Sequence, residues 1–241
     1  MAEKNKPMMY TRYAIGEIVL VVIGILIALQ INNWNEERKE DKIELSYLKE
    51  MLEDYETNLR SSKIVINKFE TMLPILTELI EQSLLDKPTI SVDSLNKAFV
   101  QISDMPTYSS TDRVYNNLIG SGDLRLINNK ALKTELSVYF ETLNILKLVQ
   151  TTHEMELVES FQPYIIDNLD FLAVAPQRIE NHRLPPPKEK NKILEVLKDR
   201  EFRNIVVLKW VIITDLLEQN RALEQININI IKLLKKVDSV H

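Results

Sequence analysis

The sequence predicts an all-α protein in which an N-terminal transmembrane helix continues into an antiparallel bundle of long helices. Three observations favour this fold class. The 241 residues include only 4 glycines, and residues that helices tolerate well dominate the composition. A long apolar stretch lies near the N-terminus. Three stripes of apolar residues with heptad-like spacing follow it.

The N-terminal stretch is long enough to cross a membrane. It is apolar without interruption over residues 18–29, and its flanks extend it to the ~20 residues that span ~30 Å of hydrocarbon. Tyr13 and Trp34 stand at its two ends, where interfacial aromatic residues are typical. We therefore expect a transmembrane signal anchor over residues 13–34.

Charged residues before this stretch predict its orientation. Lys4, Lys6 and Arg12 are opposed by a single acidic residue, so the positive-inside rule places the N-terminus in the cytoplasm. Residues 1–12 then form a cytoplasmic tail, and residues 35–241 form an all-helical bundle domain on the other side. Arg12 joins the two aromatic residues as an expected interfacial anchor.

Two alternatives to an anchor exist for this stretch. A cleaved signal peptide also begins with positive charge and an apolar run, but no small-x-small cleavage site follows here and the run is long for a secretory signal. A buried helix of a soluble domain would leave the aromatic flanks and the charge asymmetry as coincidences. An uncleaved anchor is the interpretation we favour.

A carboxylate and several small residues lie within the anchor. Glu17 either reaches back to the cytoplasmic surface or is protonated or paired with a polar group on a neighbouring transmembrane helix. Gly24 and Ala28 form a small-x-x-x-small pair, and Gly16 lies on roughly the same side as Gly24. These four residues are the predicted membrane helix contacts. The expected partners are the lipid bilayer and either a second copy of the chain or another envelope membrane protein.

Two segments carry a family resemblance. The stretch "YAIGEIVLVVIGILIALQINNWNEERK", residues 13–39, and the stretch "YNNLIGSGDLRLINNKAL", residues 115–132, resemble the opening and the middle of an uncharacterised membrane-anchored family of Bacteroidota, domain of unknown function 6090. The resemblance implies a Gram-negative cell envelope and an inner-membrane anchor, which places residues 35–241 in the periplasm. It implies no activity.

The first stripe after the anchor predicts a continuous helix. Its members alternate in spacing between three and four residues, as in a heptad seam, with Ser62 filling one gap. They are Leu45, Leu48, Leu52, Tyr55, Leu59, Ile66, Phe69 and Leu73. No glycine or proline occurs over residues 32–73, so one helix should emerge from the bilayer. Pro74 should kink or end it.

Two more stripes complete the predicted bundle. The second consists of Leu132, Leu136, Tyr139, Leu143, Leu146, His153 and Leu157. The third consists of Ile205, Leu208, Ile212, Leu216, Leu223, Ile226, Ile230 and Leu233. Three amphipathic helices can bury their seams against one another in an antiparallel bundle. An intermolecular coiled coil is the alternative.

Shorter segments connect the long helices. We expect a helix in "TISVDSLNKAFVQIS" that is capped near Ser91 or Asp93, and one in "SSTDRVYNNLIGSG" that is capped by Ser110 or Thr111 and stopped at Gly120.

Two further connections have local signals. Asn128 or Asn129 should cap the next long helix. The prolines and charges of residues 175–192 indicate an exposed loop, which is the expected contact site of the outer part.

The sequence offers no recognisable metal or catalytic motif. His153 begins "HEMEL", which has Leu157 where a zinc protease motif needs its second histidine, so His153 is interpreted as a seam or surface histidine. His182 and His241 lie far from it in the sequence. The acidic residues nearby are interpreted as a solvated helix face. They are Glu154, Glu156 and Glu159.

Composition narrows the function further. The absence of cysteine excludes disulfides, thiolate metal sites and cysteine nucleophiles. The net charge of -5 gives little electrostatic support for binding nucleic acid. We expect no cofactor, no metal and no enzymatic activity. The leading hypothesis is an interaction or structural module at the inner membrane. The alternative is a periplasmic sensory or ligand-binding bundle that signals through a membrane partner.

Overall fold

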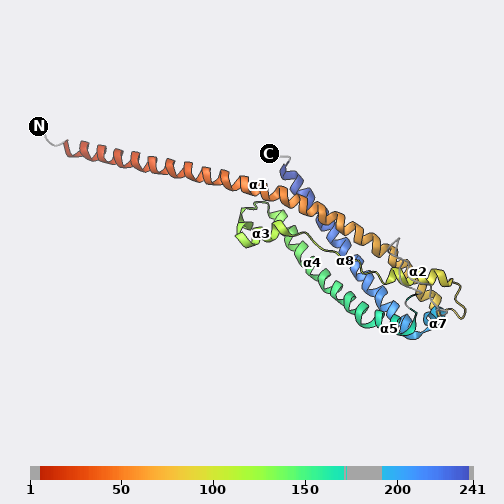
Figure 1. The fold of residues 1–241 in the computed structure, drawn as a ribbon. Coiled ribbons are helices and arrows are strands. Elements are labelled where there is room, and N and C mark those ends of the chain that lie inside the picture. The colour runs from red at the N-terminus through yellow and green to blue at the C-terminus, as the bar shows by residue number, and fades with distance from the viewer. Residues whose placement is uncertain (1–5, 171, 173–191, 239–241) are drawn as a thin grey trace. The chain divides into compact units, whose positions relative to one another are not determined.

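The computed structural model describes the backbone of residues 6–170, 172 and 192–238 and, for side chains, residues 15–170, 172 and 192–236. All of the regular structure in these ranges is helical, which confirms the predicted all-α class (Figure 1). The elements are α1 (Lys6–Leu84), α2 (Val92–Ile102), α3 (Arg113–Ser121), η1 (Asp123–Leu126), α4 (Lys130–Glu156), η2 (Leu157–Phe161), α5 (Gln162–Asn168), α7 (Ile193–Lys198) and α8 (Arg200–Asp238). His182, His241 and nearly all of the predicted loop at 175–192 lie outside the described residues.

Contacts divide the chain into two compact units. The first unit comprises residues up to 51 together with 114–128, and the second comprises 52–113 together with the residues from 129 onward. Helix α1 contributes its N-terminal part to the first unit and its C-terminal part to the second. The long-helix bundle belongs to the second unit.

Within the second unit, α8 runs antiparallel to α1. Lys235 pairs with Glu56 at 2.8 Å, near the start of this part of α1. At the other end, the indole Nε1 of Trp210 donates to Thr77 Oγ1 at 3.1 Å. The sequence numbers fall along α8 as they rise along α1, as the antiparallel prediction requires.

Helix α4 also packs antiparallel to α8. The amide of Asn229 reaches Glu135 at 3.5 Å, and Lys209 contacts His153 at 3.2 Å. Helices α1 and α4 are therefore parallel to each other, with α8 antiparallel to both. This parallel arrangement is possible because α2 and the segment that follows α2 lead the chain back from the end of α1 to the start of α4.

The predicted stripe of α4 is buried, and Glu156 is buried in addition to it. Every member of its stripe is buried, from Leu132 to Leu157, and His153 is among them. In α1 the buried spacing still alternates between three and four, but part of it is displaced by one residue. Met51, Asn58 and Met72 are buried in place of the predicted Leu52, Leu59 and Leu73, which are only partly covered.

Helix α1 does not end at Pro74. It continues to Leu84, so of the two predicted effects of Pro74, a kink or an end, the end is wrong. Proline removes the hydrogen bond to the carbonyl four residues earlier, but Pro74 and Glu70 are both exposed and water can satisfy that carbonyl. Leu76 and Leu79 are fully buried on the next turns and hold the helix in place.

Caps define the shorter helices. Ser91 accepts from the Ser94 N–H at 3.1 Å and Asn129 from the Leu132 N–H at 3.0 Å, which confirms two predicted N-caps. Helix α3 begins at Arg113 and ends at Ser121, so the predicted stop at Gly120 is wrong. The chain turns instead at Gly122, whose φ of 77° favours glycine.

Residues 108–112 form a strap that is tied to the long helices. The Asn58 amide donates to the Thr111 carbonyl at 3.1 Å and to the Tyr139 hydroxyl at 3.2 Å, and its oxygen accepts from the Thr111 N–H at 2.7 Å. Asn58 thus holds the backbone of Thr111 on both sides. Tyr108 and Tyr139 share a hydrogen bond at 2.9 Å, and burial raises the pKa of both hydroxyls, so they remain neutral.

The strap contacts predict a stability effect. Replacing Asn58 with alanine removes its bonds to Thr111 and leaves buried polar groups without partners, so the free energy of unfolding should fall by about 1–3 kcal/mol. Chemical denaturation of the full chain in detergent measures this. Asn144→Ala, on the exposed face of α4, is the control. Equal losses for the two variants would contradict the role of Asn58.

Candidate functional site

The apolar part of α1 is not covered by any of the described residues. The helix contains an 18-residue window with a mean hydropathy of 2.3, and none of that window is buried. Among the described residues, α1 is the one helix long and apolar enough to cross a membrane. A helix from the core of a soluble domain would bury at least one face, so this segment does not behave as a core helix of its own chain.

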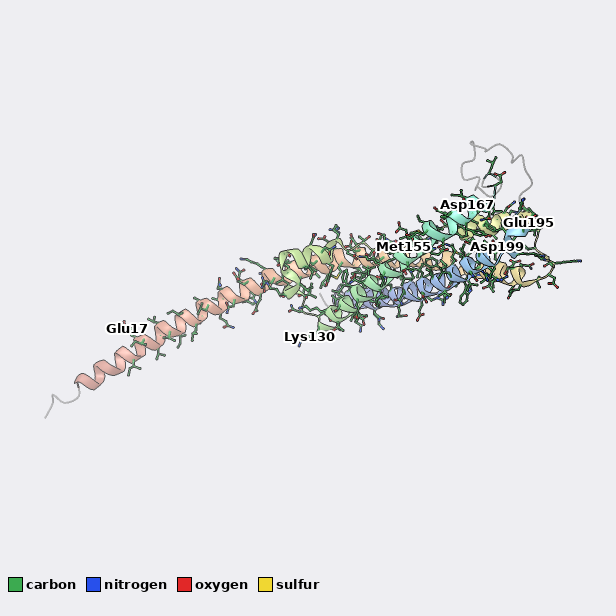
Figure 2. All side chains as sticks on the ribbon, turned by 90° about the horizontal axis from the view of Figure 1, so that it is seen from below. Glu17, Lys130, Met155, Asp167, Glu195 and Asp199 are labelled. Carbon is green, nitrogen blue, oxygen red and sulfur yellow. The ribbon has the colours of Figure 1, made fainter. Side chains whose placement is uncertain are left out.

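The predicted membrane contacts lie along this exposed segment. Glu17 is on α1 near its N-terminal end (Figure 2), and the chain places no other element against it. A Cβ added at Gly16 or Gly24 would meet no atom within 4 Å. Ala28 is exposed on the same helix. The structure therefore leaves these four positions open and does not bring them together with other side chains.

The predicted interfacial anchors bound the same segment. Trp34 is 63% exposed at its C-terminal end. Arg12 and Tyr13 lie in α1, but their side chains are outside the described residues.

In the first unit, α1 binds the segment around η1. Glu40 pairs with Arg125 at 3.2 Å. The Glu44 carboxylate accepts from the backbone N–H of Asn128 at 2.6 Å and from its amide at 2.9 Å. The sequence interpretation missed these contacts, although acidic residues four apart share one face of a helix.

The Tyr47 hydroxyl extends this row on α1. It donates to Asp123 at 3.1 Å, so the contacts run along one face of α1 from residue 40 to residue 47. The segment bound here lies within the second stretch that carries the family resemblance, residues 115–132.

The second unit contains a buried charged triad formed by His153, Glu156 and Lys209. The three residues are 1%, 5% and 0% exposed. Lys209 Nζ donates to Glu156 Oε2 at 3.0 Å and lies 3.2 Å from His153 Nε2. It also lies 5.0 Å from the centre of the Phe161 ring, within cation–π range. Helices α4 and α8 and the short η2 thus meet at one ammonium group.

The charges of the triad follow from burial and proximity. Burial, followed by the Lys209 charge, lowers the pKa of His153 to about 4, so this histidine is neutral at pH 7. Burial raises the pKa of Glu156 while Lys209 opposes that rise, and burial lowers the pKa of Lys209 while Glu156 opposes that fall. The geometry pairs Lys209 with Glu156 as an ion pair beside a neutral imidazole.

Glu156 differs from its predicted environment. We expected a solvated face, but Glu156 is buried, and its Oε1 has no hydrogen-bond partner among the described residues. Glu154 and Glu159 are exposed, as predicted. The reason is that Glu156 lies three residues after the buried His153, on the same face of α4, where it meets Lys209 of α8.

The sequence interpretation missed Lys209. It placed Leu208 in the seam of α8, but Leu208 is 47% exposed and Lys209 takes the core position. A signal was present, because Lys209 lies four residues after Ile205 and three before Ile212. Counting polar residues that fall in phase with an apolar stripe would have found it.

The triad has no arrangement for catalysis. Its ionised groups face each other and its members are closed to solvent, whereas catalysis needs a site that a substrate can reach. No cluster of three or more histidine, cysteine or acidic residues suited to a metal occurs among the described residues.

A shallow groove lies elsewhere on the second unit, between α1 and α2. Its volume is about 260 Å³. The Lys68–Asp104 ion pair, at 3.2 Å, lies on its wall. The lining residues are Asn67, Lys68, Thr71, Met72, Ile75, Val100, Gln101, Asp104 and Pro106.

A family model described as "Family of unknown function (DUF6090)" matches residues 17–158, more than half of the chain. The chain belongs to this family. The DUF6090 match begins at Glu17 within the apolar segment and ends in η2, so it includes His153 and Glu156 but not Lys209. No curated protein and no solved structure matches the chain.

The triad predicts a pH dependence of stability. Unfolded His153 binds a proton near pH 6.5, but folded His153 does so only near pH 4. Its contribution is present above pH 6.5 and is lost as the pH falls toward 4, by up to about 3 kcal/mol. The raised pKa of Glu156 acts in the opposite direction, stabilising the folded state at low pH.

The variant His153→Gln isolates the contribution of this histidine to the pH dependence. In His153→Gln, the free energy of unfolding should depend less on pH between 4.5 and 6.5, measured by denaturation of the full chain in detergent. Parallel pH curves for the two proteins would show that His153 does not titrate in this way.

Proposed function

We propose that this protein is a non-enzymatic interaction or structural module, held at the inner membrane of a Gram-negative bacterium of the Bacteroidota by a single transmembrane helix. Residues 1–12 lie in the cytoplasm, 13–34 span the bilayer, and 35–241 lie in the periplasm. The charges before the apolar segment support this orientation. The family resemblance supports the compartment.

One observation carries the membrane assignment: the apolar window of α1 has a mean hydropathy of 2.3 and none of it is buried. Each Å² of apolar surface left in water costs about 25 cal/mol. A helix of this length therefore needs a cover that the chain does not supply, and hydrocarbon provides one.

The continuity of α1 supports an anchor that is retained. The helix runs from Lys6 to Leu84, and its residues 40–47 bind the segment around η1 soon after the apolar part ends. Cleavage directly after Trp34 would cut inside this helix. A stable link between anchor and domain fits a structural role.

The exposed positions on the anchor support a partner in the bilayer. Glu17 in hydrocarbon costs a few kcal/mol unless it reaches water or a polar partner. Gly16, Gly24 and Ala28 allow a second helix to approach closely on the same side. We propose that this partner is a second copy of the chain or another envelope membrane protein.

The groove between α1 and α2 favours the sensory alternative. Ligand sites are usually concave, with a few convergent polar groups, and Lys68 and Asp104 lie on this groove's wall. These two side chains already neutralise each other at 3.2 Å. The interaction module is therefore the function we propose.

Reporter fusions test the topology. Alkaline phosphatase fused after residue 241 should be active, because it folds in the periplasm, whereas a green fluorescent protein fused there by the same route should not fluoresce. The same reporters fused before residue 1 should give the opposite pattern. A fluorescent C-terminal fusion, or a mature chain that begins after Trp34, would contradict the anchor.

Crosslinking in native membranes tests the contact. Glu17→Leu combined with Gly24→Leu should remove crosslinked neighbours of the full chain, because a bulky side chain keeps a second helix away and the polar contact is lost. Val22→Leu, on the opposite side of the helix by the 100° advance per residue, is the matched control. Unchanged neighbours in the double variant would rule out contact through this side.

A further inference from the structure

A single turn of π-helix interrupts the outer end of the bundle. Helix α4 passes directly into η2 (Leu157–Phe161), which passes directly into α5. The Gln162 N–H donates to the Leu157 carbonyl five residues earlier, as a π-helix requires. Such turns are rare and usually mark a site where the chain has a specific reason to widen.

Lys209 contacts both ends of this turn. Its Nζ donates to Glu156, the residue just before η2, at 3.0 Å. It also lies 5.0 Å from the ring of Phe161, the last residue of η2. One buried ammonium group from α8 therefore contacts the residue just before the widened turn and the last residue of that turn.

The two contacts require the π geometry. Residues five apart in an α-helix are separated by about 140° around the axis, because each residue advances about 100°. In a π-helix five residues complete about one turn, so Glu156 and Phe161 face the same side. An α-helical turn here would direct one of them away from Lys209.

The register of α5 depends on which turn forms. In the observed register, Ile165 is buried and Asn168 is exposed. Closing η2 to an α-helical turn would rotate α5 by about 100°, which would expose Ile165 and turn Asn168 inward. The two registers therefore predict opposite exposures for residues 165 and 168.

We propose that buried Lys209, held in place by its ion pair with Glu156, is a register device that holds η2 in the π form and so determines which face α5 presents. Glu156 precedes η2, so the ion pair fixes the ammonium group against the end of α4. Only the π form brings the Phe161 ring to this buried cation, and the loss of that contact disfavours the α-helical register. The proposal concerns the bundle alone, so it can fail while the membrane assignment stands.

Cysteine labelling of the full chain in detergent tests the proposal, because the natural sequence contains no cysteine. Single cysteines are introduced as Ile165→Cys or Asn168→Cys, and their reaction rates with a maleimide are measured. With Lys209 and Glu156 intact, position 168 should react fast and position 165 slowly.

The deciding background is the neutral double variant Glu156→Gln/Lys209→Met, which leaves no charge unpaired and should fold. In it the rate at position 165 should rise and the rate at position 168 should fall, each by ~10-fold or more. Lys232→Met, at an exposed position of α8, is the control and should leave both rates unchanged. Helix content by circular dichroism confirms that each variant is folded.

Two results would overturn the proposal. Unchanged rates in the folded double variant would mean that apolar packing alone sets the register. A rise at both positions would mean that α5 detaches rather than rotates.

Discussion

The apolar segment of α1 places the main constraint on this protein. Its side chains are exposed throughout residues 15–34, and the hydrophobic effect penalises the apolar ones in water. None of the described residues covers them. The rest of α1 has the opposite character, with a polar start at residues 35–42 and a buried seam from Leu48 onward. One helix thus combines an exposed apolar part with a part that packs in the core of the chain.

The seam of the bundle is not purely apolar, and several of its polar residues form hydrogen bonds with their own helix or with another segment. Ser62 donates to the Asn220 carbonyl at 3.2 Å, and the Asn220 amide donates to the Leu216 carbonyl at 2.8 Å. A heptad seam of apolar residues alone tolerates slippage by a whole repeat, whereas a buried polar residue that needs one partner does not. Asn58 and Lys209 meet the same condition with the strap and with Glu156.

These polar positions also explain where the sequence was informative. The stripe of α4 could be read except for Glu156, because its other core positions are apolar apart from one histidine. In α1 and α8, choosing only apolar residues led to Leu59 and Leu208, whereas the core holds Asn58 and Lys209. Their burial depends on partners 53 residues away in the chain in both cases, which no local pattern contains. The π turn could not be predicted either, because the residue that contacts both of its ends, Lys209, lies on another helix. The membrane contacts at Gly16, Glu17, Gly24 and Ala28 stay predictions.

The extent of the family match bears on how the bundle is assembled. Residues 17–158 include α1 and α4 but not α8. Helices α1 and α4 are parallel, and both make buried polar contacts with α8, through Ser62 and through His153 and Glu156. The matched part alone would leave both seams without their common neighbour and Glu156 without its cation. A segment that lies beyond the family match therefore completes the core, and it does so through Lys209, whose ammonium group is the only cation in contact with Glu156 among the described residues.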